Sequence, residues 1–202
     1  RRQRQMCIRD RIYQRMLTWV LDKVTKVVQF VILLVLGFFW LRGVLLSVLG
    51  MVLVVFANDF VTVSLATDNV KHTTSPNLWN VKKITLASVA IGIMLVAVLV
   101  GVEYFQLEWG ALQSLVMLML VFTSQFRVLI LRERRHWWSS RPGNELLISS
   151  AATIAVFALL GTYGTIVPQL APLQVMFILV FSAVSTLVVD FPKYYVFRRL
   201  GL

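Results

Sequence analysis

The sequence is short of charged residues, and this scarcity excludes an ordinary soluble domain. Only 14% of its 202 residues are Asp, Glu, Lys or Arg, whereas 58% are hydrophobic, and the mean hydropathy is +0.79. A soluble domain of this length cannot bury so much apolar side-chain area in one core. The composition therefore predicts a membrane protein.

Cysteine and histidine are also scarce, which excludes two kinds of site. The one cysteine, Cys7, cannot form a disulfide within the chain. The two histidines, His72 and His136, stand far apart in the sequence and lack the grouped ligands that a metal site needs. We therefore expect neither thiol chemistry nor a bound metal.

Six apolar runs are long enough to cross a bilayer as α-helices. A spanning helix needs about 17–25 residues, and none of these runs alternates polar and apolar residues as the strands of a membrane barrel do. The sequence therefore predicts an all-α polytopic membrane protein, a bundle of six transmembrane helices. The predicted spans are residues 24–41, 44–66, 84–102, 111–131, 147–167 and 173–189.

The basic residues are distributed according to the side of the membrane and do not form one basic patch. A net charge of +11 is compatible with nucleic-acid binding, but the basic residues are divided over four separate segments without a continuous basic surface. If the N-terminus is cytoplasmic, every lysine and arginine except Arg42 falls on the cytoplasmic side. The positive-inside rule then predicts a multi-pass plasma-membrane protein with both termini in the cytoplasm, and no nucleic-acid partner.

Residues 1–11 differ from the rest of the chain. They resemble the in-frame translation of a sequencing adapter, which predicts a non-native tail, and residues 12–202 would then form the transmembrane transport domain. A native basic segment on the cytoplasmic face is the alternative. From Ile12 onward, we expect one helix that begins before the membrane and continues into the first span.

One acidic residue lies deep in the second predicted span. Asp59 follows Asn58 in an otherwise apolar run. A carboxylate at that depth costs about 2.5–3.5 kcal/mol on insertion scales, so we expect Asp59 to be the principal ion-binding residue. An Asn-Asp pair also suits a locally unwound helix that presents backbone carbonyls to an ion, with Asn58 helping to shape the break. The alternative is an aspartate that only bonds to another helix.

Other polar residues lie at a comparable depth. Gln29 in the first span is about 8 Å from its inner end, close to the depth of Asp59, and Lys26 lies three residues before it on the same helix face. We expect both to tune the affinity for the ion; a bond from Gln29 to a neighbouring helix is the alternative. Ser124 and Gln125 in the fourth span form a second polar patch, which suits a second ion position or a packing contact.

These residues occur in an order that resembles the membrane region of the P-type ATPases, closest to the plasma-membrane proton pumps. Two of that family's helices, the fifth and sixth, are similar to Ile12-Tyr13-Gln14-Arg15-Met16, Asn58-Asp59, Thr67-Asp68-Asn69-Val70-Lys71 and Ser75-Pro76-Asn77-Leu78-Trp79. The loop between its eighth and ninth helices is similar to Ser124-Gln125 followed by Arg132, Arg134, Trp138 and Arg141-Pro142-Gly143. The likeness covers residues 12–202 in the same order and spacing.

The resemblance implies the ion-translocating part of an ATP-driven cation pump, moving a proton or another small cation. The family's phosphorylation motif, Asp-Lys-Thr-Gly-Thr, and its nucleotide motifs are absent, as is a P-loop. We therefore expect no catalytic residue and no ATP hydrolysis by this chain alone; ATP and Mg²⁺ would belong to missing cytoplasmic domains. The implied partners are the lipid bilayer, the transported cation, and the pump's N-terminal helices and cytoplasmic domains.

One departure from the proton pumps bears on the ion. Those pumps carry an arginine where Gln29 stands, so the charge would have to come from Lys26, one turn below, or the ion is not a proton. An independent six-helix cation channel or secondary transporter is the alternative function. Internal symmetry between the first and last three spans would favour a carrier, but the Asn-Asp pair has no counterpart in the fifth span.

Overall fold

The chain folds into a bundle of α-helices. The computed structural model describes residues 2–41, 44–68, 81–102, 109–133, 136–139 and 141–200, and within these ranges it contains no strand. The all-α prediction is therefore confirmed. The helices are α1 (Arg2–Leu41), α2 (Val48–Ser64), α3 (Val81–Val102), α4 (Trp109–Leu131), α5 (Asn144–Tyr163) and α6 (Pro172–Leu200), with short 3-10 turns at Leu65–Thr67 (η1) and Trp137–Ser139 (η2).

Each predicted span overlaps one of the six helices, although the bounds differ. The helix α1 runs without a break from Arg2 past residue 11 and on to Leu41, and α6 continues through Pro192 to Leu200. Three stretches of the described residues are long and apolar enough to cross a membrane: Leu112–Leu131, Asn144–Tyr163 and Pro172–Arg199. The apolar helix α2 is shorter, at 17 residues. That all six helices cross the membrane stays a prediction.

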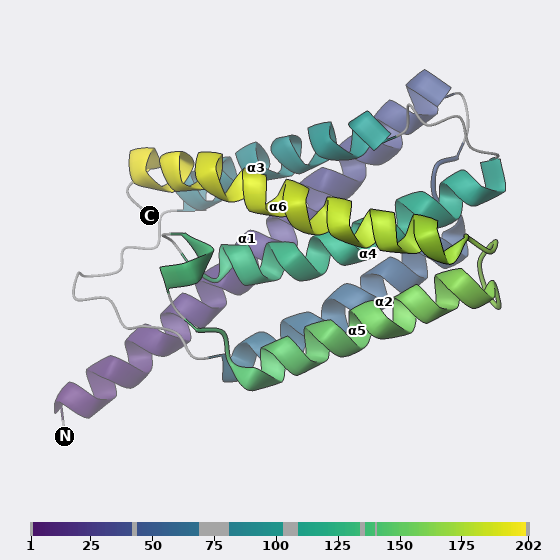
Figure 1. The fold of residues 1–202 in the computed structure, drawn as a ribbon. Coiled ribbons are helices and arrows are strands. Elements are labelled where there is room, and N and C mark those ends of the chain that lie inside the picture. Colours follow the sequence, from purple (N-terminus) through teal and green to yellow (C-terminus); the bar gives the residue numbers. More distant parts are fainter. Residues whose placement is uncertain are drawn as a thin grey trace.

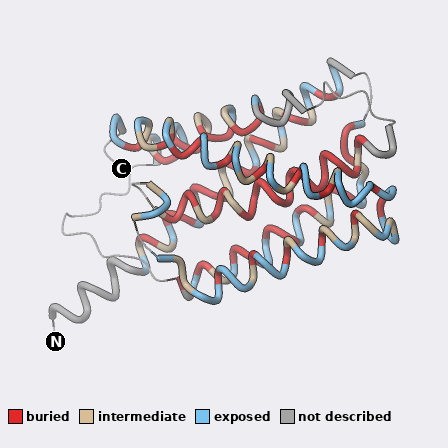
Figure 2. The backbone as a smooth tube through the Cα atoms, viewed as in Figure 1, coloured by how far each residue is buried: buried red, intermediate tan, exposed pale blue. Residues whose placement is uncertain are grey.

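The helix α4 lies at the centre of the bundle. It packs against α1, α2, α5 and α6, and Figure 1 shows α2 and α5 on one side of it, α3 and α6 on the other, and α1 crossing behind it. Its membrane-length window is 89% buried, against about a third or less for those of α5 and α6, and Figure 2 shows the buried residues running along its length. The largest apolar cluster is centred on this helix, around Leu118 and Phe122. The central helix therefore bears most of the packing.

The helix α2 is held with one face against α4. Ser47 caps its start, where its Oγ accepts a hydrogen bond from the Gly50 amide at 3.1 Å. Val54, Ala57 and Val61 follow at three- to four-residue spacing and are buried, which is the pattern of an amphipathic helix. The opposite face, which carries Asp59, is exposed in this chain.

A buried lysine of α6 completes the end of the central helix. The Lys193 ammonium donates to the carbonyl oxygens of Ile130 and Glu133, both at 2.9 Å, and pairs with Asp190 at 2.7 Å. Its side chain is 0% exposed. Carbonyls at a helix C-terminus lack partners within the helix and favour a positive charge, so Lys193 stabilises the end of α4.

The helix α1 begins and α6 ends at the same end of the bundle (Figure 1). This arrangement agrees with termini on one side, as predicted, whereas the identity of that side stays a prediction. His72 and the motif at residues 75–79 lie outside the described residues, as do Arg42 and Arg134.

Candidate ion-binding site

Polar side chains of three helices gather at one level of the bundle. The helices α2 and α4 run in the same direction (Figure 1), and Val61 and Val128 belong to one apolar cluster. One turn earlier on these helices stand Asn58 and Gln125, which are both buried. The buried polar residues of this layer are Asp22, Thr25, Lys26 and Gln29 on α1, Asn58 and Thr62 on α2, and Thr123, Ser124, Gln125 and Arg127 on α4.

Asp59 lies at the edge of this layer, on the exposed face of α2. Its side chain is 53% exposed and forms ion pairs with two lysines of α1. Lys23 bonds directly to Asp59 Oδ1, and Lys26 Nζ lies 3.5 Å from the same oxygen. The structure therefore brings Lys26 and Asp59 together, as the sequence predicted, and it adds Lys23. Both lysines reach across from α1, so their ammonium groups stand where a cation would meet the carboxylate.

Asn58 points the other way, into the bundle. It is buried, and its Oδ1 atom has no hydrogen-bond partner. The predicted local unwinding at Asn58-Asp59 is wrong in this structure, because α2 is helical without interruption from Val48 to Ser64. The stretch contains neither proline nor an inserted side chain that would open the helix. The Thr62 hydroxyl bonds to the Asp59 carbonyl at 3.1 Å, within the same helical turn.

Gln29 is bonded to Arg127, which lies near the cytoplasmic end of the predicted fourth span. Arg127 of α4 donates from Nη1 to Gln29 Oε1 at 2.6 Å and from Nε to Asp22 Oδ1 at 2.9 Å. The side chains of Arg127 and Asp22 are 3% and 0% exposed, so this is a buried ion pair. Sequence reasoning missed it. A signal existed, because Asp22 and Gln29 are seven residues apart and so share a helix face.

Ser124 and Gln125 are adjacent and buried, as the predicted polar patch requires. The Ser124 hydroxyl bonds to the Val121 carbonyl at 2.6 Å, and Gln125 Nε2 lies 3.4 Å from Ser124 Oγ. The Gln125 Oε1 and Thr123 Oγ1 atoms have no partner. Among the described contacts, none joins this patch to Asp59. The patch therefore leaves free oxygen acceptors inside the bundle, near the level of Asn58.

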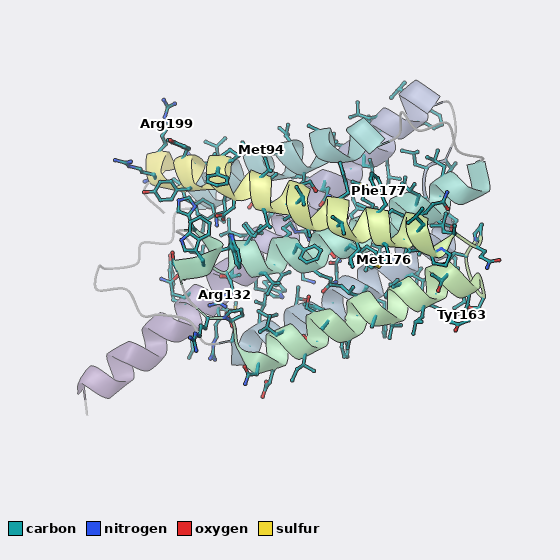
Figure 3. The ribbon with its side chains drawn as sticks, viewed as in Figure 1. Met94, Arg132, Tyr163, Met176, Phe177 and Arg199 are labelled. Atoms are coloured by element: carbon teal, nitrogen blue, oxygen red, sulfur yellow. The ribbon has the colours of Figure 1, made fainter. Side chains whose placement is uncertain are left out.

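A second polar junction lies at the predicted cytoplasmic end. The Asp68 carboxylate accepts a hydrogen bond from the Gly143 amide at 2.8 Å and pairs with Arg132 at 3.3 Å. Its backbone carbonyl accepts two hydrogen bonds from Arg15 of α1, at 2.7 and 3.1 Å. Figure 3 labels Arg132 near the end of α4. One buried aspartate thus joins α1, the end of α2 and the connection between α4 and α5.

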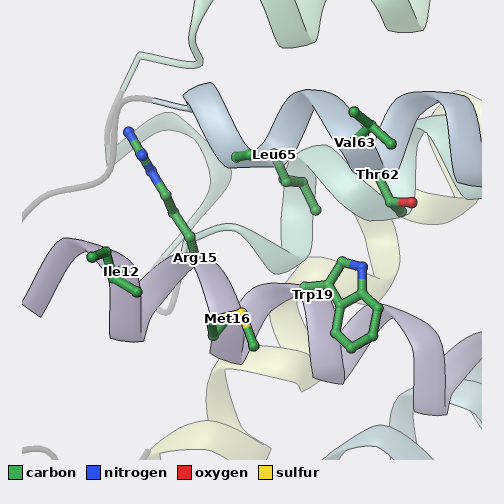
Figure 4. A pocket seen from close by; sticks show the side chains of 8 residues that line it. Ile12, Arg15, Met16, Trp19, Thr62, Val63 and Leu65 are labelled. Atoms are coloured by element: carbon green, nitrogen blue, oxygen red, sulfur yellow. The ribbon is translucent and has the colours of Figure 1, made fainter. Parts of the chain in front are cut away.

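A groove leads along α1 and α2 toward Asp59. It has a volume of about 450 Å³ and is lined by Ile12, Arg15, Met16 and Trp19 of α1, and by Thr62, Val63, Leu65 and Ala66 of α2 and η1 (Figure 4). Thr62 and Val63 are one turn beyond Asp59, and the Lys23 ammonium lies 5.8 Å from the Trp19 ring centre. The groove therefore ends beside the Lys23–Asp59 pair.

The sequence of the chain is weakly similar to that of a known transport protein. No family model matches the chain. The chain is 24% identical over 198 residues to a protein of Methanocaldococcus jannaschii named "Putative cation-transporting ATPase", and the match covers 95% of this chain but 25% of that protein. The chain therefore spans about a quarter of the length of this relative. Together with the apolar helices, this similarity supports, at a coarse level, a membrane protein related to the membrane region of the P-type ATPases.

Proposed function

We propose that the chain is the ion-translocating membrane part of an ATP-driven cation pump of the P-type, and that Asp59 is the carboxylate that binds the ion. One observation carries this proposal: Asp59 is half-exposed on an apolar face, where lysine ammonium groups are its only described charged partners. The neighbouring Asn58 oxygen is buried and without a partner. Carboxylate and amide oxygens are both ligands that bind small cations, and here they lie on the outer and the inner face of α2.

The apolar face around Asp59 needs a cover in the working protein. Phe56, Phe60 and Val63 are exposed on the same side of α2, and a carboxylate that faced lipid among them would be strongly unfavourable. We propose that the cover is made by further transmembrane helices of the same pump. This is supported by the match to only a quarter of the length of a cation-transporting relative. The ion site would then be enclosed between those helices and α2.

The two lysines define how the site releases its cation. Lys23 and Lys26 neutralise Asp59 when no ion is bound, so an incoming cation must displace their ammonium groups from the carboxylate. A movement of α1 that withdraws the lysines would raise the affinity of Asp59 for the ion, and the reverse movement would lower it. Lys26 therefore tunes the affinity directly. Gln29 acts from the buried side, and the Ser124–Gln125 patch would supply a second position for the ion.

The helix α1 is the element that could move the lysines. It extends 40 residues, from Arg2 to Leu41 (Figure 1). In the proposed pump its segment from Ile12 to Val24 would connect to the domains that bind ATP and Mg²⁺. The bonds from Arg15 to Asp68 link α1 to the end of α2. A displacement of α1 would thus be transmitted to the helix that carries Asp59. The transported ion would be a proton or another small cation.

The test replaces Asp59 in a full-length pump that includes this chain, reconstituted in sealed vesicles. We expect Asp59→Asn to abolish ATP-driven cation transport while the protein still inserts and folds. Glu145→Gln is the matched control, because Glu145 is an exposed acid on the first turn of α5, away from the site. Transport by Asp59→Asn at the rate of the control would remove Asp59 from the mechanism. Transport by the 202-residue chain alone, without ATP, would instead indicate a channel or a secondary transporter.

A further inference from the structure

The second charged group of this layer lies deeper in the bundle, on the buried side of α1 next to the side that carries Lys23 and Lys26. Arg127 reaches from α4 and is bonded to both Asp22 and Gln29, two helical turns apart on α1. All three residues are at least 98% buried. The 105 residues between Asp22 and Arg127 make this a tertiary link rather than a local one. The cluster is therefore a built site inside the bundle, separate from the exposed carboxylate.

Each member of this cluster keeps one polar atom without a hydrogen-bond partner among the residues that the structure describes. These atoms are Asp22 Oδ2, Gln29 Nε2 and Arg127 Nη2. Buried polar atoms in folded proteins are almost always hydrogen-bonded, and when no protein group is in reach, an ordered water takes the place. Arg127 bonds to both other side chains, and an unpartnered atom on each member of the cluster points to ordered solvent in this part of the bundle.

The chemistry of the three atoms selects the class of ligand. Gln29 Nε2 and Arg127 Nη2 are N–H donors, whereas Asp22 Oδ2 is an acceptor. A metal cation needs several oxygen ligands and would face the guanidinium charge, and an anion would face the Asp22 carboxylate. Water accepts hydrogen bonds from N–H groups and donates to a carboxylate, so it suits both kinds of partner.

We propose that Asp22, Gln29 and Arg127 enclose ordered water between α1 and α4, and that Arg127 is a positioning residue that turns the Gln29 amide nitrogen toward this water. The Gln29 oxygen is occupied by Arg127 at 2.6 Å, so Gln29 presents a donor to the remaining space. A cation at the second lone pair of this oxygen would face the Arg127 guanidinium, so the bond disfavours Gln29 as a direct cation ligand. The inference holds whether or not the chain is part of a pump.

The occupant can be identified by diffraction from crystals of the 202-residue chain grown in lipid. Three data sets are needed: one from untreated crystals, one after soaking in rubidium chloride, and one after soaking in sodium bromide. We expect density within hydrogen-bonding distance of the three unpartnered atoms, without anomalous signal for rubidium or bromide. A rubidium peak would identify a cation site and a bromide peak an anion site, and either would overturn the proposal. Empty space beside the three atoms would overturn it as well.

The positioning role of Arg127 can be tested in bilayers by solid-state NMR with ¹⁵N-labelled glutamine. We expect magnetisation to pass from water to the Gln29 side-chain amide, whose signal is assigned by its loss in Gln29→Met. Arg127→Met should shift this signal and change its water contact, whereas Arg127→Lys, which can still donate to the Gln29 oxygen, should preserve it. If Arg127→Met does not fold, the neutral pair Asp22→Asn with Arg127→Met serves instead. An unchanged Gln29 signal without Arg127 would refute the positioning role.

Discussion

Removing one charge of the buried Asp22–Arg127 pair should destabilise the chain far more than removing both. Asp22→Asn leaves the Arg127 guanidinium buried without a counter-ion, and Arg127→Met leaves the Asp22 carboxylate in the same state. Loss of one partner of a buried ion pair costs about 3–5 kcal/mol, whereas replacement of both by neutral groups is often close to neutral. The two groups bond at 2.9 Å and are almost wholly buried, so the full effect applies here.

A double-mutant cycle measures the coupling energy between Asp22 and Arg127. If the two substitutions acted independently, the double variant would lose about 6–10 kcal/mol, the sum of the single losses. We expect it to lose no more than either single variant, which corresponds to a coupling energy of at least about 3 kcal/mol. Equilibrium unfolding of the reconstituted chain in mixed micelles, followed by tryptophan fluorescence, measures the three free energies of unfolding.

A matched cycle on the Lys23–Asp59 pair provides the control. Asp59 is 53% exposed and Lys23 is 25% exposed, and pairs of this kind contribute about 0–1 kcal/mol. We therefore expect the Lys23→Met, Asp59→Asn cycle to give a coupling energy several times smaller than that of Asp22 and Arg127. Additive losses in the Asp22–Arg127 cycle, or equal coupling in the two cycles, would show that the buried pair does not interact as described.

Three further predictions follow from the topology, the polar junction and a glycine. Single cysteines at Ser139 and Gln169 should react with impermeant reagents from opposite sides of the membrane, Ser139 from the cytoplasm and Gln169 from outside; labelling of both from one side would contradict the predicted topology. Asp68→Ala removes a buried partner of Arg132 and should cost about 3–5 kcal/mol of unfolding free energy, and a stability equal to wild type would refute the junction. Gly164 follows α5 in the left-handed conformation, with φ 65°. Gly164→Ala should therefore lower the free energy of unfolding by about 1–2 kcal/mol in the same assay. As a control, Ala152→Gly, on the exposed face of α5, should lower it by no more than about 1 kcal/mol.

The helices could be predicted from sequence because a long apolar run without alternation of polar and apolar residues is enough to indicate a helix. The direction in which each polar side chain points could not be predicted, because it depends on which side of the helix the neighbouring helices occupy. Asp59 and Asn58 are adjacent in the sequence, yet one points out of the described bundle and the other into it. The site therefore contains the predicted residues, but they are divided between two faces of α2.

Arg127 illustrates a second limit of sequence reasoning. It is followed closely by Arg132, and a run of basic residues after an apolar stretch is typical of a helix end at the membrane surface. In the structure α4 ends at Leu131, where the predicted fourth span also ends, but Arg127 is buried against Asp22 and Gln29. The partner that makes this burial tolerable lies 105 residues earlier, and no local pattern joins the two.

The buried Lys193 has a consequence for the synthesis of the protein. The carbonyl of Ile130 that accepts its hydrogen bond is 63 residues earlier in the chain. Domains and their elements emerge from the ribosome in order from the N-terminus, so the central helix is made, and enters the membrane, while its last carbonyls still lack this partner. Those carbonyls depend on water or on other temporary partners until α6 is translated. The addition of α6 is therefore the last step of assembly. A chain whose translation stops before residue 193 lacks the lysine that bonds to the carbonyls at the end of α4.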